Sequence, residues 1–230
     1  MRIDTGCKPL RVTLLALAVL GLASAFWAEV ASGDPAGATA GGLTLSQRVL
    51  QKDELSGFTP QPNPKTLTLR AFVKEAAPSC IQTTAQGAHQ RLAAAGFRAA
   101  VISQLATGRP NDLIVASTVV QLGSAQQAQT TLQWASTDSL RPCPHVCNVS
   151  VEPFPIRGIP GAKAVRRSRA ENTSGAGPKA PFEAYDIEFA DGAFFYNVFA
   201  VAPRAGILNR NELIAAVTKL YKRVHGRPAP

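Results

Sequence analysis

The strongest constraint on the fold is a pair of apolar runs near the C-terminus that a tight turn separates. Residues 182–190 and 193–202 are rich in aromatic and β-branched side chains, and Asp191-Gly192 lies between them. Asp-Gly between two such runs is typical of a two-residue β-hairpin turn. A turn at these residues would pair Phe189 with Phe194 and gather the aromatic side chains on one face. The region is therefore predicted to be an antiparallel hairpin.

A helix is expected after this hairpin, and the same arrangement occurs earlier in the chain. Apolar residues recur at helical spacing up to Val224, before Gly226, and Asn209 with Glu212 suits a capping box. A second hairpin is expected over 97–106 and 113–122, with Ser124 and Gln127 opening the next helix. These two hairpin–helix units predict an α+β fold, an antiparallel sheet with helices packed on it. Further elements are expected at 69–76 and 85–95 (helices) and at 148–152 and 162–169 (strands).

The opposite face of the last hairpin allows two interpretations. Phe195 and Phe199 alternate there with the acids Asp186 and Glu188 on the preceding strand. A sheet face in contact with water would not expose these phenylalanines, so core packing is one interpretation. The other is a ligand or partner patch formed by these four residues. The acids are otherwise expected at a solvated or salt-bridged edge, and the run 166–169 is expected to form a polar edge strand.

The N-terminus predicts export. Arg2, Lys8 and Arg11 precede an uncharged apolar stretch over 12–28, which is the plan of a secretory signal peptide or an uncleaved anchor. Both alternatives leave the rest of the chain outside the cytoplasm, secreted or facing outward from the membrane. The expected organisation is a signal peptide or membrane anchor (1–31), a flexible linker (32–42), a single extracytoplasmic α+β domain (43–226) and a tail (227–230).

Three cysteines follow the apolar segment. In an oxidising compartment a disulfide is expected between Cys143 and Cys147, or between Cys80 and one of them. A different hypothesis uses Cys143, His145 and Cys147 as ligands of a soft metal, or as a thiol-redox site. The main prediction has no metal and no cofactor.

The charge and the motifs narrow the function. Lys and Arg exceed Asp and Glu by 24 to 15, for a net charge of +9. The basic residues are scattered along the chain, which favours a surface facing an anionic cell envelope over a nucleic-acid interface. A phosphate-binding loop, a nucleophile elbow and a zinc-protease helix are all missing from the sequence. The chain is therefore not expected to be an enzyme.

Five short segments resemble a known family. They are Leu55-Ser56-Gly57-Phe58, VVQLGSAQQA at 119–128, Gly158-Ile159-Pro160-Gly161-Ala162, Phe189-Ala190-Asp191-Gly192 with Tyr196, and KLYKRV at 219–224. With these residues the chain resembles secreted actinobacterial proteins with a PsbP-like α+β domain. It is more loosely similar to extracytoplasmic sensor domains of Ser/Thr kinases and related lipoproteins. The resemblance implies a non-catalytic domain that binds an envelope ligand or protein partner and carries no catalytic residue.

Overall fold

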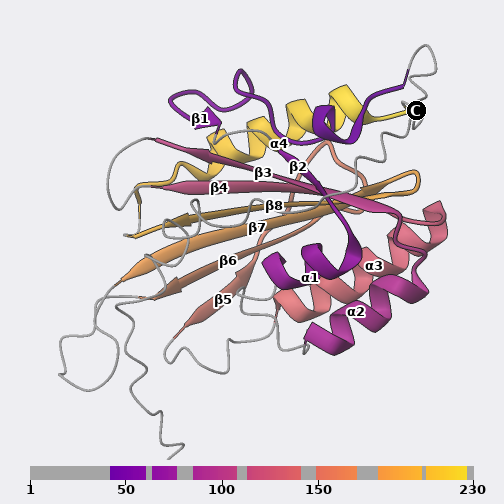
Figure 1. The fold of residues 1–230 in the computed structure, drawn as a ribbon. Helices are drawn as coiled ribbons and strands as arrows, with labels where there is room; N and C mark the ends of the chain where they lie inside the picture. The colour runs from indigo at the N-terminus through magenta and orange to yellow at the C-terminus, as the bar shows by residue number, and fades with distance from the viewer. Residues whose placement is uncertain are drawn as a thin grey trace, which may run out of the picture.

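In the part of the chain that the structure describes, eight strands form one antiparallel sheet, and four α-helices pack on it (Figure 1). The structure is a computed structural model that describes residues 42–60, 64–76, 85–107, 113–140, 149–169, 181–203 and 206–226. The strand order is β1-β3-β4-β8-β7-β6-β5, with β2 also paired to β3. The predicted α+β class is confirmed. The strands are β1 (Thr59–Pro60), β2 (Lys65–Leu67), β3 (Ala99–Ala106), β4 (Ile114–Gln121), β5 (Ser150–Pro153), β6 (Lys163–Arg169), β7 (Phe182–Asp191) and β8 (Phe194–Ala202).

Both predicted hairpin–helix units are present. β3 and β4 lead into α3 (Ala125–Ser139), and β7 and β8 lead into α4 (Arg210–Val224). The two helices lie on opposite faces of the sheet, with α1 (Leu69–Ala76) and α2 (Ala85–Ala94) on the same face as α3 (Figure 1). The Ser124 side chain caps α3 by accepting from the Gln127 amide at 3.2 Å, and Asn209 caps α4 in the same way. The sheet is therefore the middle layer of three.

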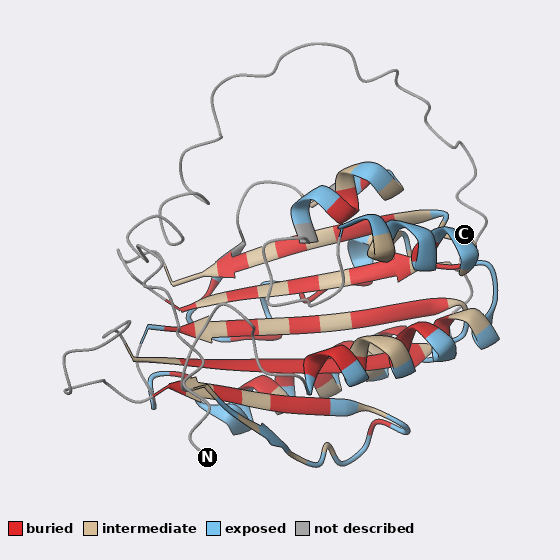
Figure 2. Cartoon of the chain, turned by 90° about the horizontal axis from the view of Figure 1, so that it is seen from below, coloured by how far each residue is buried: buried red, intermediate tan, exposed pale blue. Residues whose placement is uncertain are grey.

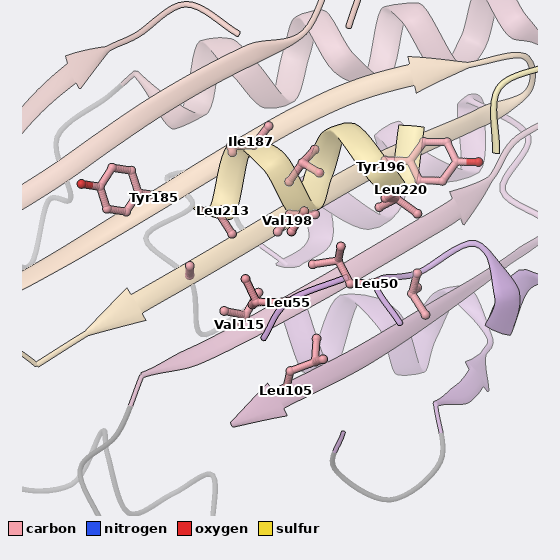
Figure 3. Close-up of a cluster of buried hydrophobic side chains, with 14 of the residues drawn as sticks. Leu50, Leu55, Leu105, Val115, Tyr185, Ile187, Tyr196, Val198, Leu213 and Leu220 are labelled. Carbon is pink, nitrogen blue, oxygen red and sulfur yellow. The ribbon is translucent and has the colours of Figure 1, made fainter. Parts of the chain in front are cut away.

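One core lies between α4 and the sheet. Leu213 and Leu220 of α4 are fully buried against Ile187 and Val198 of the central strands, and Tyr185 closes one end of the cluster (Figure 3). Each fully buried side chain of this size stabilises the fold by roughly 1.5–3 kcal/mol. A short 3₁₀-helix, η2 (Leu45–Gln47), and the loop after it cover the rest of this face.

A second core lies under the other three helices. Leu92 of α2 and Leu132 of α3 pack toward Val120 and Phe195, and Phe72 of α1 stacks on Phe97 with ring centroids 5.9 Å apart. Seen from this side, the helices carry their exposed residues outward while buried and partly buried residues alternate along the strands (Figure 2). Both faces of the sheet therefore bury apolar side chains.

The C-terminal hairpin is present, but its turn is displaced from the predicted one. Asp191 pairs with Phe194, and Phe189 pairs with Tyr196, so the loop is Gly192-Ala193. Two-residue hairpin loops need a positive φ at their first position, and Gly192 supplies it with a φ of 55°. The predicted loop would have required that conformation of Asp191. The displacement of the turn changes which residues of β7 and β8 are paired, but the same side chains remain on each face of the sheet.

The predicted polar edge strand is wrong. β6 lies between β5 and β7, and two of its arginines, Arg167 and Arg169, are buried. β7 is likewise an interior strand, so its acids are not at an edge. β6 can be interior although it carries arginines on both faces, because acids of β7 pair with Arg166 on one face and with Arg167 on the other.

The expected N-terminal segment, residues 1–31, lies outside the described residues, as does most of the linker. Among the helices in the described ranges, each is too short or too polar to cross a membrane.

Candidate functional site

A buried polar cluster lies where the end of α3 meets the sheet. It consists of Ser139 from α3, Arg167 from β6, Asp186 and Glu188 from β7, and Asn197 from β8. Asp186 and Glu188 alternate with the apolar face residues of β7, so both point away from α4 and toward α3. The two acids are 8% and 4% exposed, so their charges are shielded from water by neighbouring side chains.

Asp186 has three hydrogen-bond donors around its carboxylate in the buried polar cluster. Arg167 Nη1 lies 3.3 Å from Asp186 Oδ2, and Asn197 Nδ2 donates to Asp186 Oδ1 at 2.5 Å. Ser139 Oγ lies 3.2 Å from the same Oδ2. Three donors, one of them a cation, therefore surround this carboxylate, which is the environment that stabilises a buried negative charge.

Glu188 has a different environment. Its Oε1 lies 3.1 Å from Ser139 Oγ, and no cation pairs with it in the part of the chain described. Burial raises its pKa well above the ordinary value of 4.5, and the negative charge of Asp186 raises it further. Both carboxyls contact one hydroxyl, so they lie within about 6 Å of each other. Two unit charges at that distance repel by roughly 3 kcal/mol at an effective dielectric constant of about 20.

Arg167 joins the sheet to the helix end. Its Nη2 donates to the Ser139 carbonyl oxygen at 2.5 Å, so the guanidinium neutralises the negative end of the α3 dipole as well as pairing with Asp186. Its Nε–H is buried without an acceptor among the described residues. The position of α3 over β7 is therefore fixed partly by charge, in addition to the apolar contacts of Leu132.

A third buried acid on β7, Glu183, has a pKa shifted in the opposite direction from that of Glu188. Glu183 points to the α4 face and accepts from the Gly206 amide at 2.8 Å, from Arg166 Nε at 2.8 Å and from the Tyr185 hydroxyl at 3.0 Å. Burial by itself would raise its pKa, but these hydrogen bonds and the Arg166 charge outweigh burial, so the pKa is lowered below 4.5. Glu183 and Glu188, five residues apart on one strand, are therefore shifted in opposite directions.

The four residues of the hypothesised patch are placed differently from one another. Phe195 is buried in the core under α3, and Asp186 and Glu188 belong to the buried polar cluster. Only Phe199, opposite Asp186 on β8, is partly exposed. These four residues therefore do not form an exposed apolar patch. Sequence reasoning missed Ser139, Arg167 and Asn197, although the alternation of charged residues in β6 and β7 was a signal that one face is polar.

The cysteine-based hypotheses concern residues that the structure does not describe. Cys80, Cys143, His145 and Cys147 all lie outside the described ranges. Within those ranges, no three His, Cys, Asp or Glu side chains are grouped so that they could hold a metal ion.

Comparison with known proteins shows a likeness of fold. No family model and no curated protein matches the sequence. Two solved chains match the structure. One is the crystal structure of the extracellular domain of PknH from Mycobacterium tuberculosis, 17% identical, with a TM-score of 0.50 over 77% of this chain and 95% of that chain. At this identity the match shows a shared fold. It extends over nearly the whole length of the PknH extracellular domain and over about three quarters of this chain.

Proposed function

We propose that this protein is an exported, non-catalytic, sensor-like binding domain that acts at the outer side of the cytoplasmic membrane. The observation that carries the proposal is the shared fold, which covers 95% of the extracellular domain of PknH. The basic and then apolar N-terminal sequence supports the same location. The chain would be secreted after cleavage, or held at the membrane by residues 1–31. The finer PsbP-like relationship remains part of this proposal.

The state of the buried acids supports a role without catalysis. A general acid or base must reach a substrate, directly or through one water molecule. Asp186 is enclosed by Arg167, Asn197 and Ser139, and Glu183 is enclosed by Arg166, Tyr185 and Gly206. These carboxyls serve contacts within the protein. Turnover of any substrate that Asp186→Ala abolishes, in a variant that remains folded, would contradict the proposal.

Export is tested with a reporter enzyme that is active only outside the cytoplasm, fused after residue 230 of the full chain. We expect reporter activity in cells that make the fusion, and its loss when residues 1–31 are deleted. Washing membranes with alkaline carbonate then separates an uncleaved anchor, which stays in the membrane, from a released domain. Activity that persists after the deletion would argue against export by the N-terminal segment.

Binding is tested by photo-crosslinking in intact cells. Ile207 and Leu140 are large apolar side chains that are 51% and 49% exposed, so a photoreactive residue at either position samples the surface without disturbing the core. Gln90 on the exposed side of α2 is the matched control. We expect an envelope component, identified by mass, to be captured at an apolar position and not at Gln90. Equal capture at all three positions would mean nonspecific labelling and would count against a binding surface there.

A further inference from the structure

The buried polar cluster contains one hydroxyl between two carboxyl groups, and this limits its protonation. Ser139 Oγ lies 3.2 Å from Asp186 Oδ2 and 3.1 Å from Glu188 Oε1. A serine hydroxyl has one proton to donate and lone pairs with which to accept. It can therefore donate to one of the two carboxylates. The other contact is a hydrogen bond only if that carboxyl carries a proton and donates it to the serine oxygen.

The surroundings decide which carboxyl holds the proton. Asp186 has the Arg167 cation and the Asn197 amide as partners, so it carries the charge. Arg167 and Asn197 also favour the ionised form of Glu188, but burial and the charge of Asp186 outweigh them there. Glu188 forms no ion pair among the described residues and is more deeply buried than Asp186. The order of donation is then Glu188 to Ser139 and Ser139 to Asp186. When Glu188 is protonated, the charged members of the cluster are Arg167 and Asp186, and their charges cancel. When Glu188 loses its proton, the cluster buries a net negative charge.

Other charged groups face this cluster from the neighbouring elements. On β6, Lys163 is directly opposite Glu188 in the register but exposed, and Arg169 is buried two residues beyond Arg167. On α3, Asp138 is buried beside Ser139. On β8 the facing residues Asn197 and Phe199 are uncharged. Arg167 is thus the cation in hydrogen-bonding contact with the pair, and Asp138 adds a further carboxyl to the same helix end.

We propose that the cluster is a proton-binding switch in which the proton shared by Glu188, Ser139 and Asp186 holds the last turn of α3 on the sheet. Loss of that proton breaks the contact between Ser139 and Glu188 and leaves two like charges beneath the C-terminal end of a helix, whose dipole is also negative there. The last turn of α3, residues 136–140, then separates from β7 while the α4 face stays packed. The switch goes beyond the proposed function and does not depend on any external ligand.

The sign of the pH dependence follows from Glu188. Its pKa in the folded protein is raised, mainly by burial, above the value of 4.5 that applies when it is solvated. The stabilisation is therefore fully present below the unfolded-state pKa and is lost as pH rises through the folded-state pKa. Glu183 works in the opposite direction, because its lowered pKa contributes stability that is lost as pH falls.

The first test is a carbon NMR titration of the glutamate carboxyl groups in the full chain, purified in detergent. Glu188→Gln assigns the Glu188 signal by removing it. We expect the midpoint of Glu188 to lie above the ordinary 4.5 and that of Glu183, on the same strand, to lie below it. A Glu188 midpoint at or below the ordinary value would overturn the proposal.

The second test is amide hydrogen exchange at residues 136–140 as a function of pH, corrected for the intrinsic pH dependence of exchange. In the wild type, protection should fall as pH rises through the Glu188 midpoint. Glu188→Gln, whose amide donates at every pH, should remain protected throughout, whereas the control Glu183→Gln should keep the wild-type response. If Glu188→Gln does not fold, Ser139→Ala removes the bridging oxygen and should abolish the response. A response in Glu188→Gln that parallels the wild type, or an equal loss of protection along α4, would overturn the switch.

Discussion

The guanidinium of Arg48 lies 3.1 Å from the hydroxyl of Tyr196, and both side chains are completely buried. The same guanidinium is 4.0 Å from the centroid of the Phe194 ring, and its Nε donates to the Leu43 carbonyl at 3.3 Å. The part of the chain around Arg48, before β1, is thereby attached to the central strand β8, 148 residues away in the sequence. Arg223 adds a second attachment, because it forms a two-point ion pair with Glu54.

Replacing Arg48 by methionine should destabilise the fold. The change keeps most of the apolar length of the side chain but leaves the buried Tyr196 hydroxyl and the Leu43 carbonyl without this donor. An unsatisfied buried polar group costs about 1–3 kcal/mol. The measurement is urea unfolding, with Lys52→Met as an exposed control that should change stability by less than about 0.5 kcal/mol.

A double-mutant cycle tests whether the loss of stability comes from the contact between Arg48 and Tyr196. If the contact matters, Arg48→Met and Tyr196→Phe should show a coupling energy of about 0.5–3 kcal/mol. Additive effects would mean that Arg48 acts through packing on Phe194 alone.

The Tyr196 phenol should ionise at a higher pH than an ordinary tyrosine. Burial raises its pKa to about 12, against the opposing hydrogen bond and charge of Arg48. Because the folded-state pKa is above the ordinary 10.0, the contribution of Tyr196 to stability is complete below that value and is lost between pH 10.0 and about 12. Tyrosinate absorbance, compared between wild type and Tyr196→Phe, measures this directly. A Tyr196 signal that titrates with its ordinary midpoint in the folded protein would show that the ring is accessible to water.

Gly192→Ala should strain the C-terminal hairpin. A Cβ at this position meets no atom within 4 Å, so the cost comes from the backbone alone, whose φ is 55°. The left-handed conformation costs a non-glycine residue roughly 1–2 kcal/mol, and it costs asparagine less. Gly192→Ala should therefore lower the free energy of unfolding by about that amount, and Gly192→Asn by a smaller amount. Equal effects of both variants would locate the role of Gly192 elsewhere.

The cysteines distinguish the binding domain from the thiol or metal hypothesis. We expect one disulfide among Cys80, Cys143 and Cys147 in protein isolated from the export compartment. Intact mass after alkylation, with and without prior reduction, counts the free thiols, and peptide mapping identifies the pairing. Free Cys143 and Cys147 with stoichiometric copper or zinc, lost in His145→Ala, would favour the metal hypothesis.

The local elements of this fold could be read from the sequence because their signals are local. Alternating apolar residues located β7 and β8, and helix caps at Ser124 and Asn209 located the starts of α3 and α4 within a residue. The hairpin turn was placed one residue early because Asp-Gly and Gly-Ala both satisfy the composition of a turn. The backbone conformation that only glycine adopts without strain decided between them.

The buried polar cluster could not be predicted, since its members come from four separate elements. Ser139 is 47 residues from Asp186 and 49 from Glu188, and nothing in the local sequence of α3 indicates that its last turn reaches β7. A sequence with arginines in one strand and acids in the next reads the same whether these side chains face water or each other. Their pairing depends on β6 being interior, and the order of strands in a sheet follows from long-range contacts.

The sequence by itself determined where the longer strands and the helices lie, and which side chains share a strand face, because both follow from the period of apolar residues along the chain. The short strands β1 and β2 carry no such period and were not predicted. Only the tertiary structure decided that α3 and α4 lie on opposite faces, that β6 and β7 are interior, and that Glu188 is buried beside a second carboxyl. Burial and the distance between charges govern protonation, and both are properties of segments brought together in space.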